Sequence, residues 1–89
     1  MRLTDRVSEF VTAALADQAL PGETIDHEVM MVITNRPGGE IPHIWLQLVG
    51  YDSAGDPLIP VSVDITGPCP SLPVIEGHVA TALAWIRAQ

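Results

Sequence analysis

The sequence contains no lysine, and its only cations are four arginines, Arg2, Arg6, Arg36 and Arg87, spread over the whole chain. Eleven acidic residues bring the formal net charge to −7. Nucleic-acid binding depends on clustered Lys and Arg side chains that displace counterions from phosphates. We therefore expect no nucleic-acid partner, and the negative average field also disfavours anionic membrane surfaces.

Cysteine is almost absent, because Cys69 is the only one in the chain. A single cysteine excludes an internal disulfide and a cysteine-rich zinc site, and it is typical of a reducing compartment. Long hydrophobic runs are also lacking: the apolar positions near the N-terminus are interrupted by Ser8, Glu9 and Asp17. The sequence thus predicts neither a signal peptide nor a transmembrane segment. We expect a cytoplasmic or particle-associated protein.

The composition that remains is that of a small folded domain. The chain has 89 residues, of which 47% are hydrophobic and 17% charged. Disordered chains combine low hydrophobicity with high charge, so this one should fold. Its length allows one hydrophobic core, which predicts a single domain over residues 1–89.

Helical periodicity marks the two ends of the chain. Apolar residues recur every three or four positions over 4–19, and Pro21 and Gly22 end this helix. A second helix is predicted after Ser71, with Pro73 in its first turn. The apolar stripes consist of Leu3, Val7, Phe10, Val11, Ala14 and Leu15 in the first helix and of Ile75, Val79, Ala82, Leu83 and Ile86 in the second.

Three strands are predicted between the helices, over 24–35, 43–51 and 58–66, since these segments are rich in β-branched and aromatic residues. Pro60 falls inside the third strand and indicates an edge position. A first hairpin centred on Gly38-Gly39 would place Ile33 beside Ile44, and a four-residue second turn would place Leu48 beside Ile59. In this register the apolar residues that pair across the three strands all lie on one face of the sheet.

Both helices need an apolar surface to cover, and the sheet offers one consistently apolar face. The predicted fold is therefore α+β, a two-layer α-β-β-β-α domain with a three-stranded antiparallel meander and both helices on one face. The opposite face would remain open, with Val32 flanking Trp45. Its candidate binding residues are Met30, Val32, Trp45, Gln47, Val49 and Tyr51.

Aromatic residues and methionine are enriched where partner proteins bury surface, so this open face is a candidate protein interface. Two other interpretations stay open. A helix on this side would make it part of a three-layer core, or the face is an ordinary half-apolar surface.

The residues most able to do chemistry are His27, His43, His78 and Cys69. In the expected register His43 pairs near Thr34, about 23 Å along a strand from His27, so the two cannot share a metal. His78 fits a partly buried structural position on its helix. Cys69 lies between two prolines, and activation of its thiol would need a nearby base or cation, which nothing in the sequence guarantees. We predict no catalytic residue, no metal and no cofactor.

The order helix, three antiparallel strands, helix resembles that of the double-stranded RNA-binding domain. That family carries a lysine-rich start to its last helix, whereas Ser71–Glu76 contains no base. The binding residues of the family therefore do not carry over to this chain. The resemblance implies a shared topology and not a shared function.

The small size, acidity and lysine-free composition resemble those of accessory or virion proteins encoded by actinobacterial phages. This resemblance implies an assembly component of a particle or a protein that binds a host target, located in the virion or the host cytoplasm. The open face itself predicts a homo-oligomer or a protein that docks on another protein. The leading hypothesis is a non-catalytic protein-interaction or assembly module that associates through the face around Trp45.

Two other classes of function are weighed against it. One is a small-ligand-binding or thiol-dependent enzyme domain that uses Cys69 and His78. The other is a nucleic-acid mimic with an acidic surface that gathers Asp5, Glu9, Asp17, Asp26 and Glu28 on one face.

Alkylation of Cys69 tests the thiol-dependent alternative. We expect iodoacetamide to react slowly near neutral pH, because only the thiolate is nucleophilic and an activated thiolate alone would react fast there. The rate is followed by mass spectrometry from about pH 6 to about pH 10. Fast alkylation at the acidic end of this range would favour an activated thiol.

Overall fold

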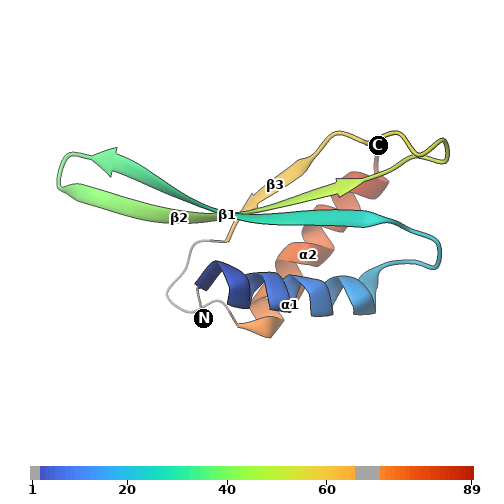
Figure 1. Cartoon of the computed structure of the whole chain (residues 1–89), viewed down its shortest axis with the longest axis horizontal. Coiled ribbons are helices and arrows are strands. Elements are labelled where there is room, and N and C mark those ends of the chain that lie inside the picture. Colours follow the sequence, from blue (N-terminus) through green and yellow to red (C-terminus); the bar gives the residue numbers. More distant parts are fainter. Residues whose placement is uncertain (1–2, 66–70) are drawn as a thin grey trace.

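The computed structural model describes residues 3–65 and 71–89, and for residues 34–36 and 40–42 it describes the backbone alone. The elements are α1 (Leu3–Gln18), β1 (Ile25–Arg36), β2 (Gly39–Gly50), β3 (Val61–Asp64) and α2 (Leu72–Arg87). The strands form one antiparallel sheet in the order β1-β2-β3, and both helices lie on the same side of it (Figure 1). The predicted two-layer α-β-β-β-α arrangement is confirmed.

The core lies between the two helices and the part of the sheet that they cover, which is the part farther from the Pro37-Gly38 turn. Leu46 and Leu48 of the middle strand have no exposed surface, and burial of one such side chain stabilises the fold by about 1.5–3 kcal/mol. Neither helix of the described chain has the length and apolar content that a membrane span requires. The buried residues are Val7, Val11, Ala14, Leu15, Ile44, Leu46, Leu48, Ile65, Ile75, Val79, Ala82, Leu83 and Ile86.

The strand pairing in the first hairpin differs by two residues from the predicted register. Met31 pairs with Ile44, and Arg36 pairs with Gly39 around a turn at Pro37-Gly38. Proline suits the second position of a turn, and the φ of +102° at Gly38 suits the third. The turn predicted at Gly38-Gly39 was therefore wrong by one residue, which shifts the pairing of the two strands by two. Because a shift of two preserves the alternation of side chains, every residue kept its predicted face.

The third strand is shorter than predicted and its register is also shifted by two. Leu48 pairs with Val61 and not with Ile59, and β3 covers only Val61–Asp64. Pro57 and Pro60 have no N–H to donate, which ends the regular ladder before Val61. Ile59 is 74% exposed, so it does not line the apolar face. The expected edge position of this strand is confirmed.

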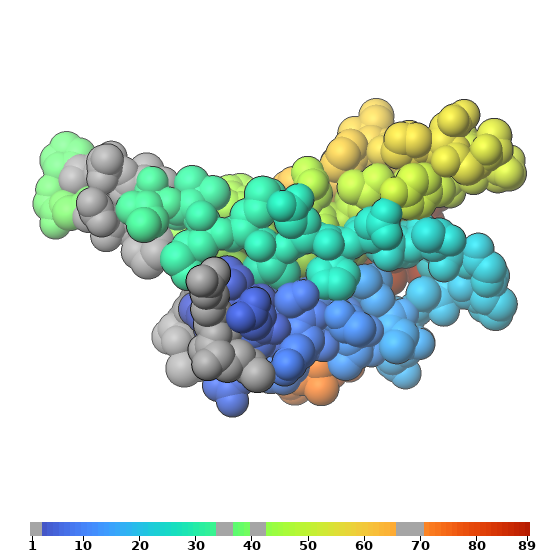
Figure 2. All heavy atoms as spheres, viewed as in Figure 1, coloured from blue at the N-terminus to red at the C-terminus, as the bar shows by residue number. Residues whose placement is uncertain are grey.

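The β1-β2 hairpin extends beyond the helices as an arm (Figures 1 and 2). The 16 residues of α1 span about 24 Å at the helical rise, whereas the 12 residues of β1 span about 40 Å. The helices therefore cannot cover the whole hairpin. Met31 and Ile33 lie on the helix-facing side, as predicted, but they are 48% and 57% exposed and not buried.

The Cα position of Gly50 has no room for a side chain. A Cβ there would lie 2.6 Å from Cγ2 of the buried, β-branched Ile86. We expect Gly50→Ala to lower the free energy of unfolding by about 1–3 kcal/mol through overpacking. Gly77→Ala is the matched control: nothing lies within 4 Å of its Cβ, and alanine should raise the helix stability by about 0.5–1 kcal/mol. Urea denaturation measures both, and equal stabilities would contradict this packing.

Candidate functional site

The face of the sheet that points away from the helices carries the six candidate binding residues. Side chains alternate along a strand, so burial of Ile44, Leu46 and Leu48 against the helices turns the residues between them to the other side. The register places the neighbouring strands in the same alternation. Val32 and Tyr51 are exposed and the other four are half-buried: Met30, Trp45, Gln47 and Val49.

Trp45 occupies the middle strand of this open face, between Met30 of β1 and Asp64 of β3. The expectation that Val32 lies beside Trp45 was wrong, because the two-residue shift pairs Val32 with His43. Trp45 is half-buried by its neighbours in the sheet and no helix covers it. The indole is therefore held by the sheet and remains accessible from the open side.

Acidic side chains border this apolar centre at both edges. Asp26 and Glu28 lie on β1, and Asp64 lies on β3. His43 Nδ1 is 3.4 Å from Asp64 Oδ2. The Tyr51 hydroxyl donates a hydrogen bond to Asp26 Oδ2, and this bond raises the pKa of Tyr51. The open face thus combines an aromatic centre with an acidic rim.

The histidines do not form a site together. His27 lies on the helix-facing side, where its Nε2 is hydrogen-bonded to Ser8 Oγ of α1 at 3.0 Å, while His43 lies on the open face. His43 pairs with Val32 and not with Thr34 as predicted. His78 is half-buried on α2. The described residues contain no group of three or more His, Cys, Asp or Glu side chains placed to hold a metal. Cys69 lies outside the described residues.

The acidic residues named for a nucleic-acid mimic are not on one surface. Asp5, Glu9 and Asp17 belong to α1, which lies on the core side of the sheet. Asp26 and Glu28 point from the opposite, open face of β1. The five residues therefore do not share the single face that the nucleic-acid mimic would require.

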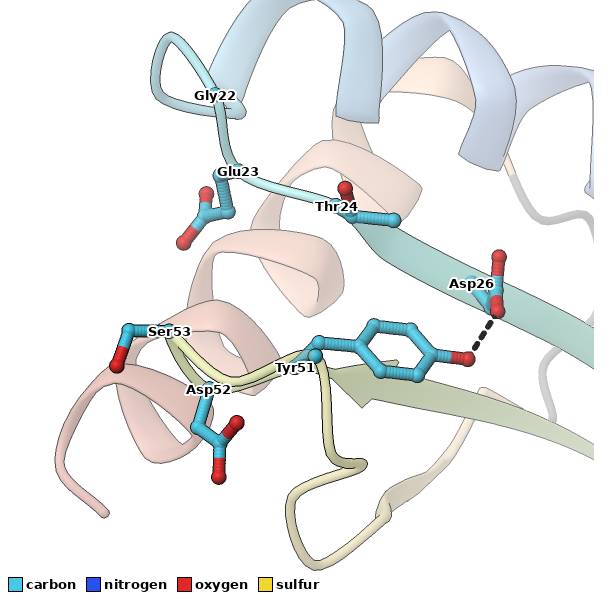
Figure 3. Close-up of a pocket in the computed structure, with 8 residues that line it drawn as sticks. Gly22, Glu23, Thr24, Asp26, Tyr51, Asp52 and Ser53 are labelled. Carbon is cyan, nitrogen blue, oxygen red and sulfur yellow. Dashed lines mark hydrogen bonds between the residues drawn. The ribbon is translucent and has the colours of Figure 1, made fainter.

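A cavity of about 470 Å³ lies beside the open face, between the loop before β1 and the turn after β2 (Figure 3). The Tyr51 ring reaches across it toward Asp26. Asp52 Oδ1 accepts the backbone N–H groups of Ala54 and Asp56 at 2.9 Å, so this side chain closes the turn. The carboxylates that line the cavity have structural partners within the fold.

The third acidic group at this cavity, Glu23, belongs to an ion pair that joins the loop before β1 to the end of α2. Arg87 donates from Nε to Glu23 Oε2 at 3.1 Å and from Nη2 to Glu23 Oε1 at 2.7 Å. Arg87 Nη2 also donates to the carbonyl of Gln18 at 3.1 Å. The hydrogen bonds from Arg87 lower the pKa of Glu23 most strongly, and partial burial opposes them.

Trp85 was missed by sequence reasoning. It lies on the outer side of α2, away from the buried stripe, and it is 65% exposed. With Thr81 it faces β3 across a groove of about 280 Å³. Its helical position outside the apolar stripe, together with its size, is the signal that marks it in the sequence.

In comparisons with known proteins, no family model, no curated protein and no solved structure matches this chain. The interpretation of its function therefore depends on the surfaces described above.

The Glu23–Arg87 ion pair predicts a pH-dependent part of the stability. Because folding lowers the pKa of Glu23, the ionised pair stabilises the fold fully above the ordinary glutamate pKa, and this contribution is lost as the pH falls through the folded-state pKa. Arg87→Ala should therefore be less stable than the wild type at about pH 7, by a margin that shrinks toward about pH 3. Urea unfolding across this range measures it.

Arg6→Ala is the control for this experiment, because Arg6 is exposed on α1 and makes no ion pair within the described residues. If the free energies of unfolding of Arg87→Ala and the wild type differ by the same amount at every pH, the ion pair does not contribute to the stability.

Proposed function

We propose that this chain is a non-catalytic protein-binding module whose partner docks on the open face of the sheet around Trp45. The observation that carries the proposal is the position of this indole on the middle strand, on a face that neither helix covers. Tryptophan, tyrosine and methionine are enriched at protein interfaces, and tryptophan and tyrosine are among the residue types that contribute most binding energy there. Trp45, Tyr51 and Met30 bring all three to one surface.

The charges on this face indicate the chemistry of the partner. Asp26 and Glu28 at one edge and Asp64 at the other surround the apolar centre, on a chain of net charge −7. A partner with an apolar patch bordered by basic residues would complement both parts. Two copies of this face would bring acidic rims together, which disfavours face-to-face self-association. Binding to such a basic partner should weaken as salt rises.

The half-buried state of Trp45 suits this role. Neighbouring side chains on β1 and β3 already restrict the indole, so little conformational freedom remains to be lost on binding. Its exposed surface is then available for burial against a partner. We propose that the module acts either as an assembly component of a virion or as a binder of a host protein, since both roles need this kind of surface.

Substitution of Trp45 tests the proposal. Trp45→Lys should weaken partner binding by at least about 30-fold, the loss typical of a hot-spot residue. Lysine suits the fold at this position because Asp64 lies opposite and its aliphatic stem still covers the sheet. Tagged wild type and variant are used for affinity capture from a lysate of the source cells, with quantitative mass spectrometry of the retained proteins. Circular dichroism checks the fold.

Trp85→Lys is the matched control, because it makes the same change at the other tryptophan, which lies on α2, is 65% exposed and is not one of the six candidate binding residues. A partner retained by Trp85→Lys and lost by Trp45→Lys supports the open face as the binding site. A partner retained by Trp45→Lys and lost by Trp85→Lys would show that the binding site is the groove between β3 and α2. Equal retention of the partner protein by both variants would contradict the proposal.

A further inference from the structure

The outer edge of β1 is the second surface that the fold leaves open. The amide of Ile65 donates to the carbonyl of Ile44 at 2.8 Å, so the even-numbered residues of β2 direct their backbone groups to β3 and the odd-numbered ones to β1. The even-numbered residues of β1 therefore bond to β2. Val29, Met31 and Ile33 direct their N–H and C=O groups outward, where no other described strand lies.

The side chains along this edge are apolar on both faces of the strand. Val29, Met31 and Ile33 point to the helix side, where Met31 and Ile33 extend past the helices. Met30 and Val32 point to the open side. No charged residue occurs from position 29 to position 35 of the sequence. Folded proteins protect exposed edges with lysine, proline, bulges or inward charges, and this segment has none of these.

We propose that this edge pairs with the same edge of a second copy of the chain, as two antiparallel β1 strands related by a twofold axis at Met31. In this register Met31 lies opposite Met31 of the second copy, and Val29 lies opposite Ile33. On the other face Met30 lies opposite Val32. Every cross-strand pair between positions 29 and 33 is then apolar, and each outward backbone group from Val29 to Ile33 meets a partner group.

The edge of β1 is self-complementary, which favours a second copy of the chain as its binding partner. A twofold interface uses the same patch on both molecules, and an antiparallel strand pair centred on one residue satisfies this condition. Charge supports the same choice. Most of the surface of a chain with net charge −7 repels another copy, whereas positions 29–35 bring no like charges together. The uncharged edge is thus where two copies can approach.

Pairing at this edge would join the two sheets into one of six strands, in the order β3-β2-β1-β1-β2-β3. Ile33 of each copy would lie beside Val29 of the other, at the position where α1 lies beneath the sheet. The exposed side chain of Ile33 in each copy would then be covered by α1 of the other copy. Met30 and Val32 belong to both surfaces, but this inference does not depend on the proposed partner of Trp45, because it rests on the outward backbone groups of β1.

Oligomeric state in solution tests the proposal. Size-exclusion chromatography with light scattering and sedimentation equilibrium should show a concentration-dependent dimer of the wild type. Ile33→Lys should raise the dimer dissociation constant by at least about tenfold, because it places a charge in an apolar interface. Ile59→Lys is the matched control: it makes the same change at a 74% exposed isoleucine outside the edge, and it should dimerise as the wild type does.

Met31→Pro tests the backbone pairing itself. The N–H of Met31 points outward, so proline at this edge position removes a donor that only the second copy would use. We expect a folded monomer by circular dichroism and light scattering. In a Cys69→Ser background, Met31→Cys should also be cross-linked efficiently by a short bifunctional maleimide, because the two side chains meet at the axis. Ile59→Cys should not be cross-linked.

A wild type that stays monomeric up to about 1 mM, where even a binding free energy of about 4 kcal/mol would populate a dimer, overturns the proposal. So does a dimer that Met31→Pro and Ile33→Lys leave intact while both variants remain folded. Trp45→Lys separates this inference from the proposed function, since it should leave the dimer unchanged. Its loss of the captured partner is judged independently of the oligomeric state.

Discussion

Alternation of side chains along β2 is the constraint on which the rest of the molecule depends. Ile44, Leu46 and Leu48 are buried beneath both helices, and this burial supplies much of the core. Since neighbouring residues of a strand point to opposite faces, the same burial forces Trp45 and Gln47 onto the other side. The open face is therefore a direct geometric consequence of the core. A change of register by one residue would exchange the two faces, whereas the shift of two that the structure shows leaves both intact.

The mismatch between the lengths of the helices and of the hairpin explains the second open surface. A strand advances more than twice as far per residue as a helix, so a 12-residue strand extends past a 16-residue helix. The molecule measures 47 × 23 × 20 Å as a result. The distal arm keeps its backbone pairing between β1 and β2 but has no layer beneath it. Apolar residues such as Ile33 are then exposed although they lie on the core side of the sheet.

Charge divides the surface into regions with different possible partners. In the two proposals, the rim formed by Asp26, Glu28 and Asp64 attracts a basic partner to the open face, while the uncharged edge of β1 allows an acidic chain to meet its own copy. The ion pair of Glu23 with Arg87 has a different role, because it holds the loop before β1 against the end of α2. One acidic chain thus uses its carboxylates for cohesion in one place and for an electrostatic border in another.

The sequence by itself determined the elements, the two layers and the face to which each strand residue points, because helical and strand periodicities are local properties of the chain. It also located the open-face residues around Trp45. Only the tertiary structure decided the register, the short β3, the exposure of Met31 and Ile33, and the separation of the acidic residues by the sheet. These depend on where Pro37 and Gly38 turn, on how far the helices reach, and on contacts between residues distant in sequence such as Glu23 and Arg87. Local periodicity carries no information about such distances, since they are set by the packing of whole elements against one another.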